Sequence, residues 1–223
     1  MRLFVAVVPP DAVAIELASA VASLRELPGS GALRWTARES WHFTLAFLGE
    51  VDEAAVPGLT ARLGRAAHRT PPFSLALRGG GHFGDRTLWV GAAGGAPELR
   101  LLARRTEAAA RKAGLAVEEH RSYRPHLTLA RGRGGTELGP YADALDAFRG
   151  APWTVRELTL VRSELPRSGV PGERPRYEVL ARRPLGGGAG LAGRRLPGAG
   201  RGRLTSTVWT PRPETGSWPV CSC

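Results

Sequence analysis

The chain has 223 residues, which is long enough for one large domain or for two small lobes with a hydrophobic core. Its formal charge of +11 comes almost entirely from arginine; it suits a polyanionic partner, but a coding bias toward Arg, Ala, Gly and Pro explains it equally well. No segment approaches the roughly 20 apolar residues of a membrane span, and the only two cysteines, Cys221 and Cys223, fit neither a disulfide framework nor a zinc site, so we expect a cytoplasmic protein with no membrane partner.

The first half of the chain predicts helices that alternate with strands. Residues 2–8 (RLFVAVV) predict a strand, and Asp11 is placed to cap the helix that follows. That helix has four apolar residues on one face: Val13, Leu17, Val21 and Leu24. Extended segments are expected at 33–36 (LRWT) and 42–49 (HFTLAFLG), then a helix over 53–67, then paired strands at 73–80 and 86–92.

The second half predicts a similar series. A helix is expected over 97–113, stopped by Gly114, and a strand at 126–131 (HLTLAR). A short helix follows that carries Tyr141, Leu145 and Phe148 and ends near Gly150. The segments 153–165 (WTVRELTLVRSEL) and 176–183 (RYEVLARR) predict the closing strands.

The two halves suggest an internal duplication with a pseudo-twofold arrangement, because each contributes helices, strands and one copy of the same short motif. Residues 184–223 differ from the rest: they are rich in Gly, Pro and Arg and show no hydrophobic period. Such a segment cannot bury enough apolar surface to offset the entropy of ordering. We therefore expect a folded domain over 1–183 and a disordered tail over 184–223.

The repeated motif is His-x-Thr-x, at His42–Leu45 (HFTL) and at His126–Leu129 (HLTL). Successive side chains of a strand point to opposite faces, so His42 shares a face with Thr44, and His126 shares one with Thr128. The apolar residues between and after them face the core. If the two strands face each other across a cleft, two imidazoles and two hydroxyls meet in one small volume.

This set of groups suits acid/base chemistry on a phosphoester. Histidine titrates near neutrality, so one imidazole can take a proton from an incoming oxygen while the other gives one to a departing oxygen. The hydroxyls of Thr44 and Thr128 are placed to stabilise charge on the phosphate oxygens. Arg131 can bind the same phosphate through two hydrogen bonds, provided that the strand bulges or ends before it.

A nucleotide substrate also needs a flat surface for its base, and Tyr123 is the candidate least suited to a core position, since it lies among Arg121, Ser122 and Arg124. Trp35, Phe83 and Trp89 are further candidates. No carboxylate or third histidine lies at ligand spacing beside either motif, so we expect neither a metal nor another cofactor.

The chain resembles the 2H phosphoesterases, and among them the RNA 2′,3′-cyclic phosphodiesterases, also called 2′-5′ RNA ligases. The resemblance covers residues 1–183 and lies in five segments in order: RLFVAVVPP, LRWTARESWHFTLAFLGEV, FSLALRGGGHFGDRTLWVG, YRPHLTLAR and LTLVRSEL with YEVL. It implies an α+β, bilobal, pseudo-twofold fold in which two antiparallel-rich sheets flank a central groove, with helices outside. It also implies catalysis without a metal.

The resemblance further implies roles that the residues do not settle. His42 would protonate the leaving ribose O3′, and His126 would activate water. Thr44, Thr128 and Arg131 would bind the phosphate, and the product would be a 2′-phosphate. Ligation of an RNA 5′-hydroxyl without ATP would be a side activity. We expect a monomer that acts on RNA with a 2′,3′-cyclic phosphate end. Two alternatives stay open: an RNA-binding protein with inactive motifs, and a 2H enzyme that acts on a small cyclic nucleotide.

Overall fold

The computed structural model describes residues 1–117, 123–133, 135–164 and 175–186. The main folded unit begins at Met1 and includes all of them, so most of the tail predicted for 184–223 lies outside the described residues. Leu185 is buried and its N–H donates to the carbonyl of Arg156, so the described fold continues past residue 183 to Gly186.

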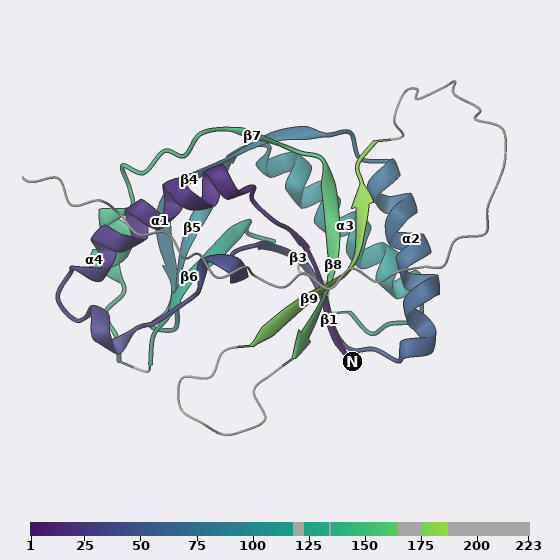
Figure 1. The fold of residues 1–223 in the computed structure, drawn as a ribbon, viewed down its shortest axis with the longest axis horizontal. Coiled ribbons are helices and arrows are strands. Elements are labelled where there is room, and N and C mark those ends of the chain that lie inside the picture. The colour runs from purple at the N-terminus through teal and green to yellow at the C-terminus, as the bar shows by residue number, and fades with distance from the viewer. Residues whose placement is uncertain (118–122, 134, 165–174, 187–223) are drawn as a thin grey trace, which may run out of the picture. The chain divides into compact units, whose positions relative to one another are not determined.

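Nine strands of the described chain form one sheet in which every pairing is antiparallel (Figure 1). The strands are β1 (Arg2–Val7), β2 (Arg34–Trp35), β3 (Phe43–Glu50), β4 (Phe73–Phe83), β5 (Thr87–Gly94), β6 (His126–Arg131), β7 (Trp153–Val155), β8 (Glu157–Glu164) and β9 (Arg176–Pro184). The helices are α1 (Asp11–Arg25), α2 (Val56–His68), α3 (Ala96–Lys112) and α4 (Gly139–Ala144).

The sheet has two halves. Its strand order is β7-β4-β5-β6-β3-β1-β8-β9, with β2 beside β6. The two halves meet at β3 and β6, where Phe43 lies opposite Leu127 and both side chains are fully buried. The two predicted sheets are therefore present as halves of one continuous sheet.

The order of elements repeats between the halves. In the first series, β1 pairs with β3, while α1 reaches the other half of the sheet, where the carboxylate of Glu16 accepts from the N–H of Ala151, just before β7. In the second series, β5 pairs with β6, while α3 packs on β3 of the first half. The last strand of each series pairs with the other half of the sheet: β4 follows the first series but pairs with β5, and β8 follows the second series but pairs with β1. This exchange is the pattern that an internal duplication predicts.

Both motif strands contain a bulge at the same place. In β3, Ala46 pairs with Val5 and Thr44 with Ala6, so Leu45 has no partner. In β6, Ala130 pairs with Leu88 and Thr128 with Trp89, so Leu129 is the extra residue. A bulge shifts the alternation of faces by one residue. Each leucine and the alanine after it are consequently both buried, and the next residue returns to the face of the histidine.

Local details differ from the sequence predictions at three places. Asp11 is the first residue of α1 and not its cap: Pro10 holds that position, without a side-chain hydrogen bond. The segment 153–165 divides at Arg156 into β7, which pairs with β4, and β8, which pairs with β1. The helix α4 ends at Ala144, so Leu145 lies in the turn that follows it and Phe148 lies beyond that turn.

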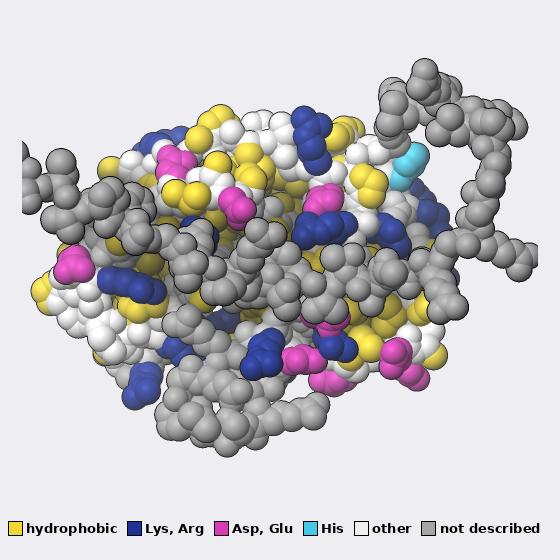
Figure 2. All heavy atoms as spheres, in the orientation of Figure 1, with side chains coloured by type: hydrophobic (Ala, Val, Ile, Leu, Met, Phe, Trp, Pro, Cys, Tyr) yellow, Lys and Arg dark blue, Asp and Glu magenta, His cyan; other side chains and the backbone are white. Residues whose placement is uncertain are grey.

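The surface carries charge of both signs. Figure 2 shows Lys and Arg side chains spread over the visible face, with Asp and Glu between them. On this face the positive charge is therefore not gathered into a single patch. None of the helices described is long and apolar enough to cross a membrane.

Candidate active site

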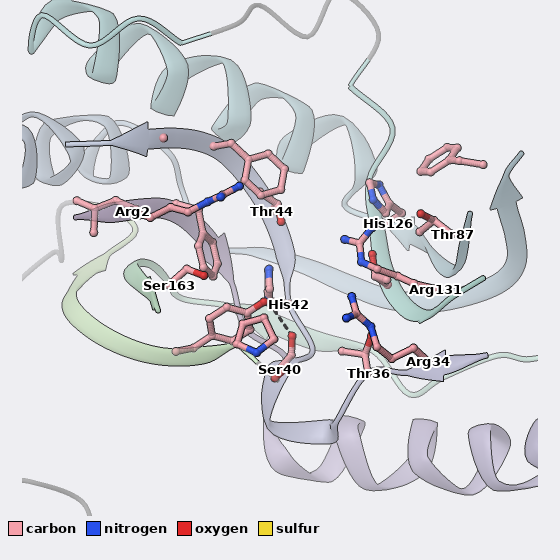
Figure 3. Close-up of a pocket in the computed structure, with 18 residues that line it drawn as sticks. Arg2, Arg34, Thr36, Ser40, His42, Thr44, Thr87, His126, Arg131 and Ser163 are labelled. Atoms are coloured by element: carbon pink, nitrogen blue, oxygen red, sulfur yellow. Dashed lines mark hydrogen bonds between the residues drawn. The ribbon is translucent and has the colours of Figure 1, made fainter. Parts of the chain in front are cut away.

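A groove of about 440 Å³ lies where the two halves of the sheet meet (Figure 3). Six residues singled out from the sequence line it: His42, Thr44, His126, Thr128, Arg131 and Phe83. His42 immediately precedes β3 and Thr44 lies on it, while His126 and Thr128 lie on β6, so each half of the sheet supplies one His-x-Thr pair. The pairs converge because β3 and β6 are neighbours at the junction of the halves.

Each histidine is held by the same hydrogen bond. Nδ1 of His42 lies 2.7 Å from the carbonyl oxygen of Ser40, and Nδ1 of His126 lies 2.8 Å from that of Arg124. A carbonyl only accepts, so Nδ1 carries the hydrogen in both rings. This assigns the tautomer and leaves Nε2 as the nitrogen that can exchange a proton with a bound group.

Aromatic rings fix both imidazoles from the side. The ring of Phe4 stacks on His42 with centroids 4.7 Å apart, and Tyr177 meets His42 edge-on at 5.7 Å. On the other half, Phe83 meets His126 edge-on at 4.9 Å and Trp89 lies 6.3 Å from it. The two rings are thus oriented before any substrate arrives, which acid/base catalysis requires.

The surroundings of the histidines favour their neutral forms. Burial lowers the pKa of His42 to about 4, although the carbonyl of Ser40 opposes the shift and the charge of His126 adds to it. Burial also lowers the pKa of His126, and the positive charges of Arg131 and Arg124 contribute. Desolvation disfavours a cation most when no anion is near. A bound phosphate would supply that anion and raise both values.

The two motif strands present the same histidine and threonine to the groove, but they differ two residues after the bulged leucine. The segments His42–Phe47 (HFTLAF) and His126–Arg131 (HLTLAR) match at four of six residues, and both bulge at their leucine. The bulge brings Arg131 to the face of His126, as the sequence prediction for this residue required. On the other strand it brings Phe47, which is 58% exposed. The residue that follows the bulge is therefore a cation on the strand of His126 and an aromatic ring on the strand of His42.

Tyr123 is placed differently from the other predicted site residues. It does not line the groove but borders a neighbouring hollow together with Phe47, Phe83 and Arg124. Its hydroxyl donates to the carbonyl of Thr44 at 2.8 Å, and burial raises the pKa of this phenol. This hydrogen bond ties the segment before β6 to β3 at the first motif.

Several residues that line the groove were not predicted from the sequence. Arg2 on β1 and Arg34 on β2 both reach the groove, and Tyr177 comes from β9, far along the chain. Arg34 pairs directly with Arg131 across β2 and β6, so the two guanidinium groups leave the sheet on the same side. In Figure 3 these two lie on one side of His42 and Arg2 on the other. Side chains two residues apart on a strand share a face, so placing Phe4 on the groove face of β1 would have indicated Arg2 as well.

Within the described parts of the chain, no three His, Cys, Asp or Glu side chains are grouped so that they could hold a metal ion.

The site and the fold together define a 2H phosphoesterase, with one His-x-Thr pair on each side of a groove in a bilobal antiparallel sheet. The chain belongs to the 2′-5′ RNA ligase superfamily, whose family model matches residues 9–167. This confirms both the family resemblance and the α+β fold predicted from the sequence.

Individual relatives agree with this assignment. A protein of Thermus thermophilus named RNA 2′,3′-cyclic phosphodiesterase is 33% identical over 215 residues, which cover 89% of this chain and 97% of the relative. A Geobacillus stearothermophilus protein of the same name is 34% identical over 68% of this chain, but the match spans only 47% of its own length. The crystal structure of Escherichia coli LigT complexed with 3′-AMP superposes with a TM-score of 0.65 at 30% identity, covering 82% of this chain and 97% of that one. These names confirm the prediction of an enzyme.

Proposed function

We propose that the protein hydrolyses 2′,3′-cyclic phosphate ends of RNA to 2′-phosphates. The observation that carries this proposal is the pair of histidines, each fixed through Nδ1 to a carbonyl and each lining the same groove. The threonines and Arg131 around them supply donors for a phosphate. The names of the Thermus and Geobacillus relatives support RNA cyclic phosphate as the substrate.

In the proposed reaction, His126 takes a proton from water through Nε2 as the water oxygen attacks phosphorus. The bond from phosphorus to O3′ breaks, and His42 gives its proton from Nε2 to O3′. One P–O bond forms and one breaks, and the phosphate stays on O2′. Charge that builds on the non-bridging oxygens is stabilised by Thr44, Thr128 and Arg131. Which histidine is the acid follows from the family resemblance alone.

The lowered pKa values make the pH profile of kcat/KM a test of this pairing. His42 must be protonated and His126 neutral, and activity falls where either condition fails in the free enzyme. Since the pKa of His42 is about 4 and burial lowers that of His126 from its usual value, we expect a bell whose maximum lies below pH 6.5. Because the two histidines interact, the two limbs of the pH profile report pKa values of the pair and not of either histidine alone.

The profile of kcat should lie at higher pH than that of kcat/KM, because the bound phosphate anion favours both cationic forms. The measurement is initial rates from pH 3.5 to 9 at limiting and at saturating substrate. A kcat/KM maximum above pH 7 would contradict the proposal that these two histidines control turnover.

The same site could also join RNA ends. If an RNA 5′-hydroxyl replaces water at phosphorus, the same proton transfers form a 2′-5′ linkage, and no ATP is consumed. The family name favours this second activity. Water is far more concentrated than RNA ends, so we propose hydrolysis as the main reaction and ligation as the minor one.

The proposed function is tested with an oligonucleotide that ends in a 2′,3′-cyclic phosphate, incubated with the full chain in EDTA. We expect a 2′-phosphate as the product and full activity in the chelator. A 3′-phosphate would contradict the proposed direction of cleavage. RNA binding without any turnover would favour the alternative of an RNA-binding protein with inactive motifs, and its affinity should then fall steeply with salt.

A further inference from the structure

Three hydrogen-bond donors lie side by side on neighbouring strands in the half of the sheet that carries His42. They are Arg2 on β1, Ser163 on β8 and Tyr177 on β9, and we call them the donor row. Leu3 is opposite Arg162 in the antiparallel β1–β8 ladder, so Arg2 is level with Ser163, and Ser163 pairs with Tyr177. All three residues line the groove.

The donor row is electropositive, and its cation meets no acidic partner among the described residues. Glu50 is opposite Arg2 on β3, but its carboxylate lies 3.3 Å from the N-terminal ammonium group. Within the described parts of the chain, Arg2 forms no ion pair, and no acidic residue lines the groove. The positive charges of Arg131, Arg2 and Arg34 all act on the phenol of Tyr177. The groove therefore favours the binding of an anion beside Arg2.

Arg2, the cation of the donor row, is displaced from His42 by about one nucleotide, while the ring of Tyr177 meets His42 edge-on at 5.7 Å. Phe4 stacks on His42, and Arg2 precedes Phe4 by two residues on the same face of β1. Two residues of a strand span roughly 7 Å. In Figure 3, Arg2 lies on the side of His42 away from Arg34 and Arg131. A groove of about 440 Å³ also has room for a ligand of nucleotide size.

We propose that the donor row binds a second phosphate, the one attached to the 5′ oxygen of the nucleoside whose cyclic phosphate lies between the histidines. This inference rests on the proposed function and specifies its substrate. The guanidinium of Arg2 makes charge-assisted hydrogen bonds to the second phosphate, and the hydroxyls of Ser163 and Tyr177 donate to its other oxygens. The substrate is then a nucleotide with a phosphate on its 5′ side, as in an RNA strand, and not a bare cyclic nucleoside phosphate.

The test compares two small substrates that differ by one phosphate: adenosine 2′,3′-cyclic phosphate and its 5′-phosphorylated form. For the wild-type chain we expect kcat/KM to be about tenfold higher with the 5′-phosphate, as the loss of one charged hydrogen bond predicts. The Arg2→Gln variant should lower this preference about tenfold. Ser163→Ala should lower it in the same direction by a smaller factor. The control is Arg65→Gln, which removes an exposed arginine of α2 and should keep the wild-type preference.

The outcomes separate this inference from the proposed function. Equal kcat/KM for the two substrates in the wild type would overturn the second phosphate site and leave hydrolysis standing. Equal loss on both substrates in Arg2→Gln would also overturn it, because Arg2 would then serve the reacting phosphate. If the wild type turns over neither these substrates nor an oligonucleotide with a cyclic end, the proposed function itself fails.

Discussion

Replacing either histidine of the groove should lower kcat by about 10²-fold or more, the usual contribution of a positioned acid or base. His42→Ala and His126→Ala each remove the group that exchanges a proton through Nε2. The measurement is single-turnover hydrolysis of an oligonucleotide with a 2′,3′-cyclic phosphate end. His82→Ala is a matched control, since His82 also bonds a carbonyl through Nδ1 but does not line the groove. Wild-type rates in either of the first two variants would contradict the account.

A change of leaving group should distinguish the two histidines. Sulfur in place of O3′ departs without a proton, so a substrate with this bridging sulfur no longer needs the acid. We expect it to restore most of the activity of His42→Ala and little of that of His126→Ala, whose deficit is in the activation of water. Rescue of His126→Ala alone would reverse the roles that the family resemblance implies.

Removing the guanidinium of Arg131 should have the second largest effect, a fall in kcat of about 10²-fold, in the range for one donor to a charge that develops in the transition state. Arg131→Gln keeps a polar side chain but loses the charge and the paired donors. Arg131→Lys keeps the charge and should recover only part of the rate, since a lysine cannot form two parallel bonds to a phosphate.

The control for this prediction is Arg133→Gln, because Arg133 is exposed, lies two residues further along and does not line the groove. Both variants lose one positive charge, so any long-range effect of charge cancels in the comparison. If Arg131→Gln changes KM and leaves kcat unaltered, Arg131 contributes to ground-state binding only, and its proposed role in the transition state is wrong.

The two motifs made much of this site predictable from the sequence. Alternation along a strand places His42 with Thr44 and His126 with Thr128, and the structure brings all four to one groove. The alternation of side chains between the two faces of the sheet fails just after each threonine, because each strand bulges at the following leucine. Phe47 reaches the groove for that reason, and the match between HFTLAF and HLTLAR is the signal that could have revealed it.

Other groove residues depend on tertiary structure that local patterns do not contain. Tyr177 reaches His42 because β9 joins β8 at the edge of the first half, and nothing near Tyr177 in the sequence indicates that partner. The segment 153–165 looks continuous, yet Arg156 separates β7 from β8 because each pairs with a strand of a different half. The hydrogen bond of Tyr123 to Thr44 likewise links residues 79 positions apart.

The central claim is that His42 and His126 act together on one phosphorus atom, and a double-mutant cycle tests it most directly. Single-turnover rates are measured for the wild type, for both alanine variants and for the double variant. Groups that act as a unit are strongly non-additive, so the double variant should be about as slow as the slower single variant. If the two losses instead multiply, the histidines contribute independently and the account of a paired acid and base is contradicted.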